Sequence, residues 1–341
     1  MKCFCLLFIF CLLSCSNKQD KEGLIVNCQH EILFDDDEYI LGKPTCMALV
    51  DSVLAISDLQ TNPMLHLFNV KTGEQIGQYL SRGVGPNEFM RIGTLERLNG
   101  DTLFFHDLNK RTCYFLVLPN KEYEDVQIIE AFRCSKVAHN TLIPLKNNSY
   151  VASGIYPKGR FCLLTDSGTT EQYWGIYPFR DDMEKSFSNI VKTQAYMGQL
   201  SSSPTKDKFV FCAYAAKIFS FYKYINGNIQ LIKEIQNSLP DYVYGENMGM
   251  YMGTSKNTPI TYLDVCATNQ FVYLLYSGKT VGGDGLNAFE SNVVQVYDWR
   301  GEWVKTLCLS VNIKELTVSE DDKMMYAIAD LPNPIIVRFG L

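Results

Sequence analysis

The amino-acid sequence predicts an all-β protein: a single six-bladed β-propeller made of four-stranded antiparallel blades. Tyr and Phe each occur 20 times and Gly 23 times among 341 residues, a composition that favours strands and turns. A polar turn followed by a short apolar run recurs six times along the chain. The copies lie about 50 residues apart, which is the length of one propeller blade. The repeats therefore favour a single ring-shaped domain over the two ordinary domains that chain length alone suggests.

Each repeat begins with an apolar run behind a polar turn. The six runs are Val53–Asp58, Thr102–Asp107, Tyr150–Ser153, Phe209–Tyr214, Phe271–Tyr276 and Met324–Ile328. In the first two runs Leu54 aligns with Leu103, and Asp58 aligns with Asp107. Further alternating runs follow several copies, as in Leu65–Asn69, and Gly-containing turns between them indicate hairpins.

Three segments fall outside this pattern. Ile25–Ile40 precedes the first repeat, and we expect it to supply the outer strand of the last blade and so cover an open sheet edge. The propeller then occupies residues 25–341. Arg180–Lys192 can form one or two helical turns in a connection between blades. Val281–Leu286 is rich in glycine and is interpreted as a surface loop, with a lid as the alternative.

The N-terminal residues predict export and lipid attachment. The apolar run Cys3–Leu13 reaches about half way across a bilayer core of about 30 Å, so residues 1–14 fit a signal peptide. Leu12-Leu13-Ser14-Cys15 resembles a bacterial lipobox, which makes Cys15 the lipidation site and its acyl chains the contact with the membrane. The alternative is an ordinary secretory signal with a chance cysteine. Residues 15–24 form a polar tether. Ser16 is not an aspartate, so the resemblance implies an outer membrane lipoprotein that faces either the periplasm or the medium.

The net charge and the cysteine pattern limit the classes of function that the sequence supports. The net charge is −6, so no basic surplus indicates a nucleic-acid partner. Eight cysteines follow Cys15: Cys28, Cys46, Cys113, Cys134, Cys162, Cys212, Cys266 and Cys308. An even number in an exported protein permits disulfides, yet most of these residues lie in apolar strand-like runs and are better interpreted as core. Disulfide formation and oligomeric state stay open. No CxxC motif occurs, so the sequence does not predict a zinc knuckle.

One loop carries a family resemblance. Ser81–Phe89 (SRGVGPNEF) resembles a loop of TolB-like six-bladed propeller lipoproteins of the Bacteroidota and, more loosely, of NHL-repeat propellers. Phe271–Lys279, Val296–Gly301 and Asn333–Val337 resemble a late-blade strand, a hairpin and the closing strand of that family. The resemblance implies a fold and an envelope location, and it implies no particular activity.

Five residues are candidates for binding. Arg82 and Glu88 flank the bend of the resembling loop and could contact an anion and a cation, or could pin the loop to its neighbours. Asp58 and Asp107 stand at strand ends in register, and His106 precedes the second. Such groups can converge on the channel of a propeller and bind calcium, or they can stabilise the turn after the strand.

The sequence favours a binding module over an enzyme. It contains no phosphate-binding loop, no dinucleotide fingerprint and no Gly-x-Ser-x-Gly elbow. We therefore expect a membrane-anchored envelope propeller that binds a protein, peptide or glycan and needs no cofactor. The alternative is a calcium-dependent hydrolase or lactonase with its site at the central channel. A third interpretation is a structural spacer within an envelope complex.

Overall fold

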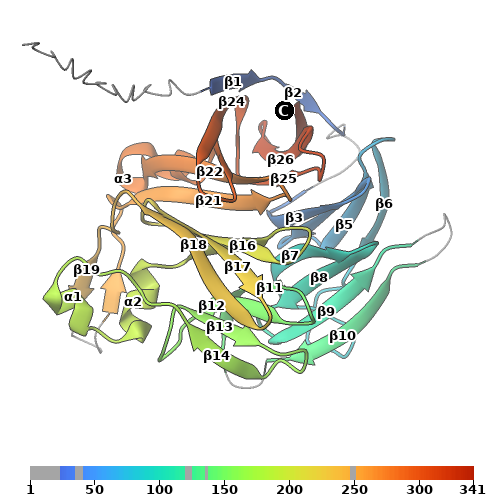
Figure 1. The fold of residues 1–341 in the computed structure, drawn as a ribbon. Coiled ribbons are helices and arrows are strands. Elements are labelled where there is room, and N and C mark those ends of the chain that lie inside the picture. The colour runs from blue at the N-terminus through green and yellow to red at the C-terminus, as the bar shows by residue number, and fades with distance from the viewer. Residues whose placement is uncertain (1–23, 35–40, 120–124, 135–136, 246–250) are drawn as a thin grey trace, which may run out of the picture.

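The computed structural model describes residues 24–34, 41–119, 125–134, 137–245 and 251–341. Six β-sheets stand in a ring around a central channel (Figure 1). Each sheet is antiparallel in its four blade strands, and the strands nearest the axis are β3, β7, β11, β15, β21 and β25. The six inner strands contact one another in order and close the ring. This arrangement confirms the predicted six-bladed β-propeller.

The strands of each blade follow one another along the chain. Blade 1 is β3 (Pro44–Val50), β4 (Val53–Asp58), β5 (Leu65–Asn69) and β6 (Glu74–Tyr79). Blade 2 is β7 (Ile92–Asn99), β8 (Thr102–Asp107), β9 (Thr112–Val117) and β10 (Gln127–Arg133). Blade 3 is β11 (His139–Pro144), β12 (Tyr150–Gly154), β13 (Phe161–Leu164) and β14 (Thr170–Trp174). Blade 4 is β15 (Gly198–Ser202), β16 (Lys208–Ala213), β17 (Ile218–Ile225) and β18 (Asn228–Gln236). Blade 5 is β21 (Pro259–Ala267), β22 (Phe271–Thr280), β23 (Ser291–Asp298) and β24 (Trp303–Ile313). Blade 6 has three strands from the end of the chain, β25 (Glu315–Val318), β26 (Met324–Asp330) and β27 (Pro334–Gly340).

The start of the chain completes the last two blades. Strand β2 (His30–Ile32) pairs antiparallel with β27 and becomes the outer strand of blade 6. Strand β1 (Leu24–Cys28) pairs parallel with β24 and gives blade 5 a fifth strand, which no pattern in the sequence predicts. Figure 1 shows these two strands beside the last strands of the chain. Each covers an edge that would otherwise expose unpaired backbone groups.

Short helices occur in the connections between strands. Helices α1 (Asp182–Ser186) and α2 (Asn189–Ala195) lie between blades 3 and 4; both begin in the segment Arg180–Lys192 that was expected to form helical turns, and α2 extends three residues beyond it. The hairpin of β19 (Val243–Gly245) and β20 (Tyr251–Gly253) lies between blades 4 and 5. The glycine-rich segment after β22 forms α3 (Val281–Asp284) and a 3-10 turn, η1 (Gly285–Phe289), instead of an irregular loop. Within the described residues, no helix is long and apolar enough to cross a membrane.

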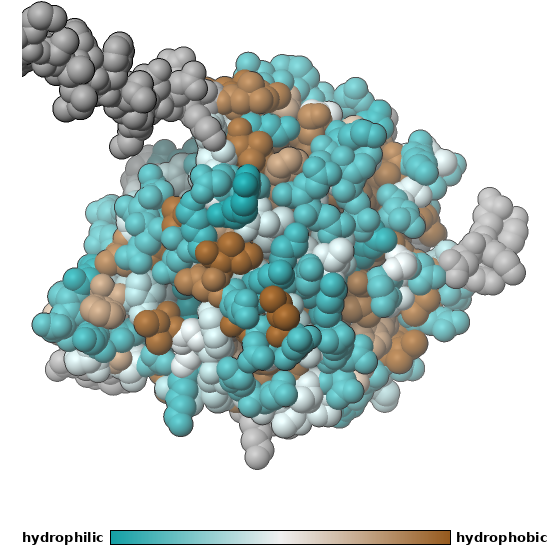
Figure 2. Space-filling view, viewed as in Figure 1, coloured by the Kyte–Doolittle hydropathy of each residue, from teal (hydrophilic) through white to brown (hydrophobic). Residues whose placement is uncertain are grey.

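The hydrophobic core lies between neighbouring blades. Where blade 3 faces blade 4, Phe161 packs edge-to-face against Phe209 and Phe211, and all three side chains are buried. Such contacts add the preferred geometry of aromatic pairs to the burial of large apolar surfaces. The outside is mostly hydrophilic on the face that Figure 2 shows, with apolar residues in separate groups. The aromatic side chains of the predicted strands therefore pack against the neighbouring blades.

Candidate functional site

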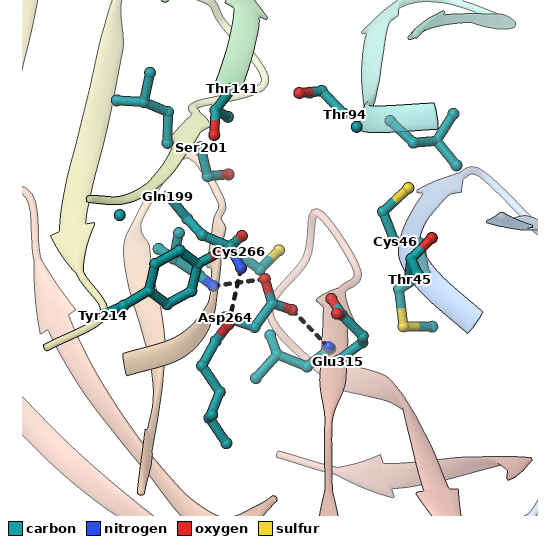
Figure 3. Close-up of a pocket in the computed structure, with 18 of the residues that line it drawn as sticks. Thr45, Cys46, Thr94, Thr141, Gln199, Ser201, Tyr214, Asp264, Cys266 and Glu315 are labelled. Atoms are coloured by element: carbon teal, nitrogen blue, oxygen red, sulfur yellow. Dashed lines mark hydrogen bonds between the residues drawn. The ribbon is translucent and has the colours of Figure 1, made fainter. Parts of the chain in front are cut away.

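The central channel contains a cavity of about 750 Å³. Its wall includes residues from the inner strands of all six blades, so no single stretch of sequence forms it. Ten of the lining residues have hydroxyl, thiol, amide or carboxyl side chains and are labelled in Figure 3: Thr45, Cys46, Thr94, Thr141, Gln199, Ser201, Tyr214, Asp264, Cys266 and Glu315.

Irregularities in four inner strands decide which side chains line the channel. The pairing of β3, β7, β11 and β21 with the second strand of each blade shifts by one residue between Pro44 and Cys46, Ile92 and Thr94, His139 and Thr141, and Tyr262 and Asp264; β7 and β21 each have one further shift. The residues immediately after these shifts are Cys46, Thr94, Thr141 and Asp264, and all four line the cavity. A β-bulge bends its strand and re-aims the following side chain. The ring of bulges therefore sets the chemistry of the channel wall.

An acidic pair is the main charged feature of this wall. Asp264 of β21 is buried and accepts hydrogen bonds from the backbone N–H groups of Val265 and Leu316, both at 2.8 Å. Its carboxyl lies close to that of Glu315, the first residue of β25. Figure 3 shows the two carboxyl groups side by side. Blades 5 and 6 thus bring together two acids that lie far apart in sequence.

The two acids of the pair have different protonation. Burial raises the pKa of Asp264 to about 6, although its two backbone hydrogen bonds oppose the rise. The pKa of Glu315 is raised well above its usual range, first by burial and then by the charge of Asp264. Near neutral pH, Asp264 is therefore mostly ionised, while Glu315 has a strongly raised tendency to hold its proton. The pair can both donate and accept a proton.

Neutral polar groups surround the pair. The Gln199 amide donates to the Leu263 carbonyl at 2.8 Å, which holds the side chain beside Asp264. Tyr214 lies next to it and remains 37% exposed, so its ring is accessible from the channel mouth. Across the channel, burial and the nearby Glu315 raise the pKa of the Cys46 thiol to about 12. That thiol stays protonated and is a poor nucleophile.

Ion pairs cross one end of the channel. Lys206 of blade 4 lies 3.2 Å from the Glu96 carboxylate of blade 2, and the Ser202 hydroxyl donates to the same carboxylate at 2.7 Å. Arg97 of blade 2 pairs with Glu320, which follows the inner strand of blade 6. Each pair joins blades that are not neighbours, so it spans part of the channel opening. This end lies where the inner strands finish.

The two aspartates in register have the same local role. The buried Asp58 carboxylate accepts hydrogen bonds from the backbone N–H groups of Gly42, Lys43, Gln60 and Thr61. Asp107 does the same for Met90, Arg91, Asn109 and Lys110. Each side chain ties the turn after its own strand to the segment that enters the blade. Neither aspartate lines the cavity.

The loop that carries the family resemblance is tied to its surroundings. The Arg82 guanidinium donates to the backbone carbonyls of Leu59 and Thr61, and its backbone N–H donates to Asn62 at 2.9 Å. The Glu88 carboxylate accepts from the Gly85 N–H at 2.7 Å. Both side chains therefore hold the loop, and neither lines the cavity.

The remaining sequence candidates also lie away from the channel. His106 is 1% exposed on β8 and does not line the cavity. Cys15 lies outside the described residues. The structure thus brings none of the sequence candidates to the channel, and it places Asp264 and Glu315 there instead. Asp264 follows the apolar pair Tyr262-Leu263 within a buried strand, and that isolated charge was the available signal.

Known proteins share this fold at low sequence identity. A comparison with curated protein sequences finds no match. A Bacteroides fragilis protein named for its expected export is 11% identical, with 92% of this chain and 98% of that chain covered and a TM-score of 0.54. A gluconolactonase from Xanthomonas campestris is 10% identical, with 92% and 89% covered and a TM-score of 0.51. The sequence also matches the family described as TolB-like 6-blade propeller-like over residues 25–321. Because that match spans most of the chain, this protein belongs to the TolB-like six-bladed propeller family.

Proposed function

We propose that this protein is a cell-envelope binding module that takes a sugar residue of a glycan into its central channel. The cavity is the observation that carries the proposal. Its volume of about 750 Å³ lies in the range of about 300–1,000 Å³ that is usual for small-ligand sites. A single site of this size suits one small ligand or the end of a longer chain, whereas a folded partner would contact the rim alone.

The chemistry of the wall favours a ligand rich in hydroxyl groups. A sugar hydroxyl both donates and accepts, and the hydroxyls of Thr45, Thr141 and Ser201 can do the same. The ionised Asp264 is a strong acceptor, and the protonated Glu315 is a donor. Aromatic rings such as that of Tyr214 offer a flat apolar surface for the C–H face of a sugar. The wall therefore offers donors, acceptors and one such surface within a single cavity.

The ligand would enter at the mouth where the inner strands begin. Ion pairs of Glu96 with Lys206 and of Arg97 with Glu320 cross the opposite end. Tyr214 and Phe289 follow β16 and β22, whose last residues pair with the first residues of the inner strands β15 and β21, and both line the cavity. This geometry supports entry past Tyr214 toward the acidic pair.

Envelope location is part of the proposal. The signal segment and Cys15 support export and attachment to the outer membrane through lipid. The Bacteroides fragilis protein of the same fold, named for its expected export, is consistent with this placement. The orientation toward the periplasm or the medium is a separate question, which protease accessibility on intact cells would answer.

A panel of neutral sugars tests the proposed ligand class. Saturation-transfer NMR with glucose, galactose, mannose, N-acetylglucosamine and their disaccharides should give signal for at least one probe. The variant Thr141→Phe fills the channel and should abolish that signal. Thr72→Phe, on the exposed turn between β5 and β6, is the matched control and should keep it. Absence of signal for every sugar, or equal signal in both variants, would reject the proposal.

The acidic pair also favours a second candidate, hydrolysis by acid–base catalysis. Two carboxyl groups with separated pKa values are the usual tools of such enzymes. Release of nitrophenol from nitrophenyl glycosides or esters, lost in Glu315→Gln, would support this function. The calcium-dependent version requires six or more oxygen ligands at one ion. Calorimetric titration with calcium, with and without chelator, tests it, and no heat with no thermal shift would reject it.

A further inference from the structure

A cluster of metal-ligating side chains lies outside the channel, between blades 2 and 3. His106, Cys113 and Cys134 place one ligand atom each within 4.8 Å of the other two, and all three residues are buried. None of them lines the central cavity. They come from β8, β9 and the residue after β10, so no short sequence motif connects them.

Strand pairing brings the three side chains together. His106 lies directly opposite Cys113 in the β8–β9 ladder, and Cys113 lies opposite Phe132 in the β9–β10 ladder. Opposed residues share a face of the sheet, and so do residues two apart on one strand. Cys134 follows Phe132 by two residues and therefore points to the same face as His106 and Cys113. The backbone N–H of Cys134 donates to the Arg111 carbonyl at 2.8 Å, which fixes its position.

The His106 ring lacks any hydrogen-bond partner. Both Nδ1 and Nε2 are buried, and neither nitrogen has a donor or acceptor within reach among the described residues. Most buried polar side chains in folded proteins are hydrogen-bonded or hold an ion, so two unpartnered nitrogens on one buried ring point to a ligand.

We propose that His106, Cys113 and Cys134 form a binding site for a zinc ion. Two sulfur donors and one imidazole form a soft set, which suits zinc and excludes calcium and magnesium as the natural ligands. Tetrahedral zinc with these donors needs ligand atoms about 3.5–3.8 Å apart, so side-chain shifts of about 1 Å complete the site. Binding displaces the two thiol protons to solvent, and zinc with two thiolates and a neutral imidazole has no net charge. A neutral complex fits the apolar space between the blades.

His139 is the nearest further donor. It begins β11 of blade 3, and its ring centroid lies 6.4 Å from that of His106. The His139 Nδ1 lies 2.6 Å from the Tyr156 hydroxyl, which leaves Nε2 as the ring nitrogen available to a metal. Metal-ligating histidines usually have a partner of this kind at the second ring nitrogen. We assign His139 as the fourth ligand and Tyr156 as its positioning residue.

A disulfide between Cys113 and Cys134 is the alternative for the two close sulfur atoms. It would satisfy the cysteines, but it would leave both nitrogens of His106 without partners. The zinc site accounts for all three residues. The two alternatives differ in mass, because a disulfide removes two hydrogen atoms from the chain and zinc adds one metal ion.

Cobalt is a direct spectroscopic probe of the proposed site. The full chain, purified under reducing conditions and stripped with chelator, should take up one cobalt ion. It should develop a thiolate charge-transfer band and the visible bands of a tetrahedral site, and zinc should remove both. His106→Gln should weaken zinc binding by more than about 100-fold, beyond the roughly 10- to 100-fold effect expected for Tyr156→Phe. Cys212→Ser removes a buried thiol of blade 4 and is the matched control that should bind as the wild type does.

Two further measurements use the wild-type chain, so they test the proposal even if a variant fails to fold. Native mass spectrometry of the wild-type chain should show one zinc per molecule, and zinc should protect Cys113 and Cys134 from alkylation relative to chelator-treated protein. The inference is overturned if the purified chain lacks two hydrogen atoms and takes up no zinc after reduction. It is also overturned if the cobalt bands survive in His106→Gln.

Discussion

Replacing Asp264 by asparagine should change how stability depends on pH. Asparagine has nearly the same shape but cannot ionise. The folded state raises the pKa of Asp264 from 3.8 to about 6. At about 1.36 kcal/mol per pKa unit, the shift corresponds to about 3 kcal/mol. Because the folded-state pKa is the higher one, this stability is present below pH 3.8 and is lost as pH rises through about 6.

The expected result is a pH-dependent difference between variant and wild type. From about pH 4 to about pH 8, the difference in unfolding free energy should move by about 3 kcal/mol in favour of Asp264→Asn. A constant cost lies beneath this change, since the asparagine oxygen cannot serve both Val265 and Leu316 as well as a carboxylate does. That cost is about 1–3 kcal/mol and does not alter the slope. Removing the Asp264 charge also relieves Glu315, which adds to the change in the same direction.

Urea denaturation followed by tryptophan fluorescence at several pH values measures this difference. Asp166→Asn, at an exposed aspartate of blade 3, is the control and should stay within about 0.5 kcal/mol of wild type. A difference between Asp264→Asn and wild type that is constant over the pH range would refute the reasoning. So would a change that favours the wild type as pH rises.

Three other predictions follow from the contacts described above. Asp58→Ala and Asp107→Ala each leave four backbone N–H groups without an acceptor. Each substitution should lower the free energy of unfolding by about 2–4 kcal/mol in urea denaturation, and a loss below about 1 kcal/mol in either would contradict the anchoring role. Gly83→Ala places a Cβ 1.9 Å from the Glu88 carboxylate and should cost about 1–3 kcal/mol, a cost that should shrink in a Glu88→Ala background if this contact is the cause. Cys15→Ala should move the protein from the membrane to the soluble fraction, and an unchanged membrane pool would overturn the lipid anchor.

The blade repeat was visible in the sequence because each copy contains its own turn and strand. Asp58 and Asp107 aligned because each anchors the entry of its blade through four backbone amides. Such contacts are local, so they recur at the repeat length. Strand β1 was not predictable in this way, because its parallel pairing joins Leu24 to Lys305. No periodic pattern reports a contact between opposite ends of a chain.

The two candidate sites could not be predicted from the sequence, for a related reason. Asp264 and Glu315 belong to different blades, and Asp264 lines the channel after a bulge that no turn residue marks. His106, Cys113 and Cys134 meet only because two strand ladders place them on one face. In both cases the residues are ordinary for their local sequence. Their chemistry arises from sheet pairing and register.

The bulges are a repeated backbone feature of this propeller, but the side chains that follow them differ from blade to blade. Four blades have a bulge in the inner strand, near its start in β3, β7 and β11 and in the middle of β21, yet the residue that follows is Cys46, Thr94, Thr141 or Asp264. The backbone feature is therefore repeated while the exposed chemistry differs from blade to blade. Only Asp264 in this ring is charged, and keeping it there costs stability near neutral pH because burial raises its pKa. Asp264 is held by two backbone N–H groups and lines the cavity, while its buried charge opposes folding near neutral pH. A ligand explains such a charge better than the scaffold alone does, which supports the acidic pair as the centre of the proposed recognition.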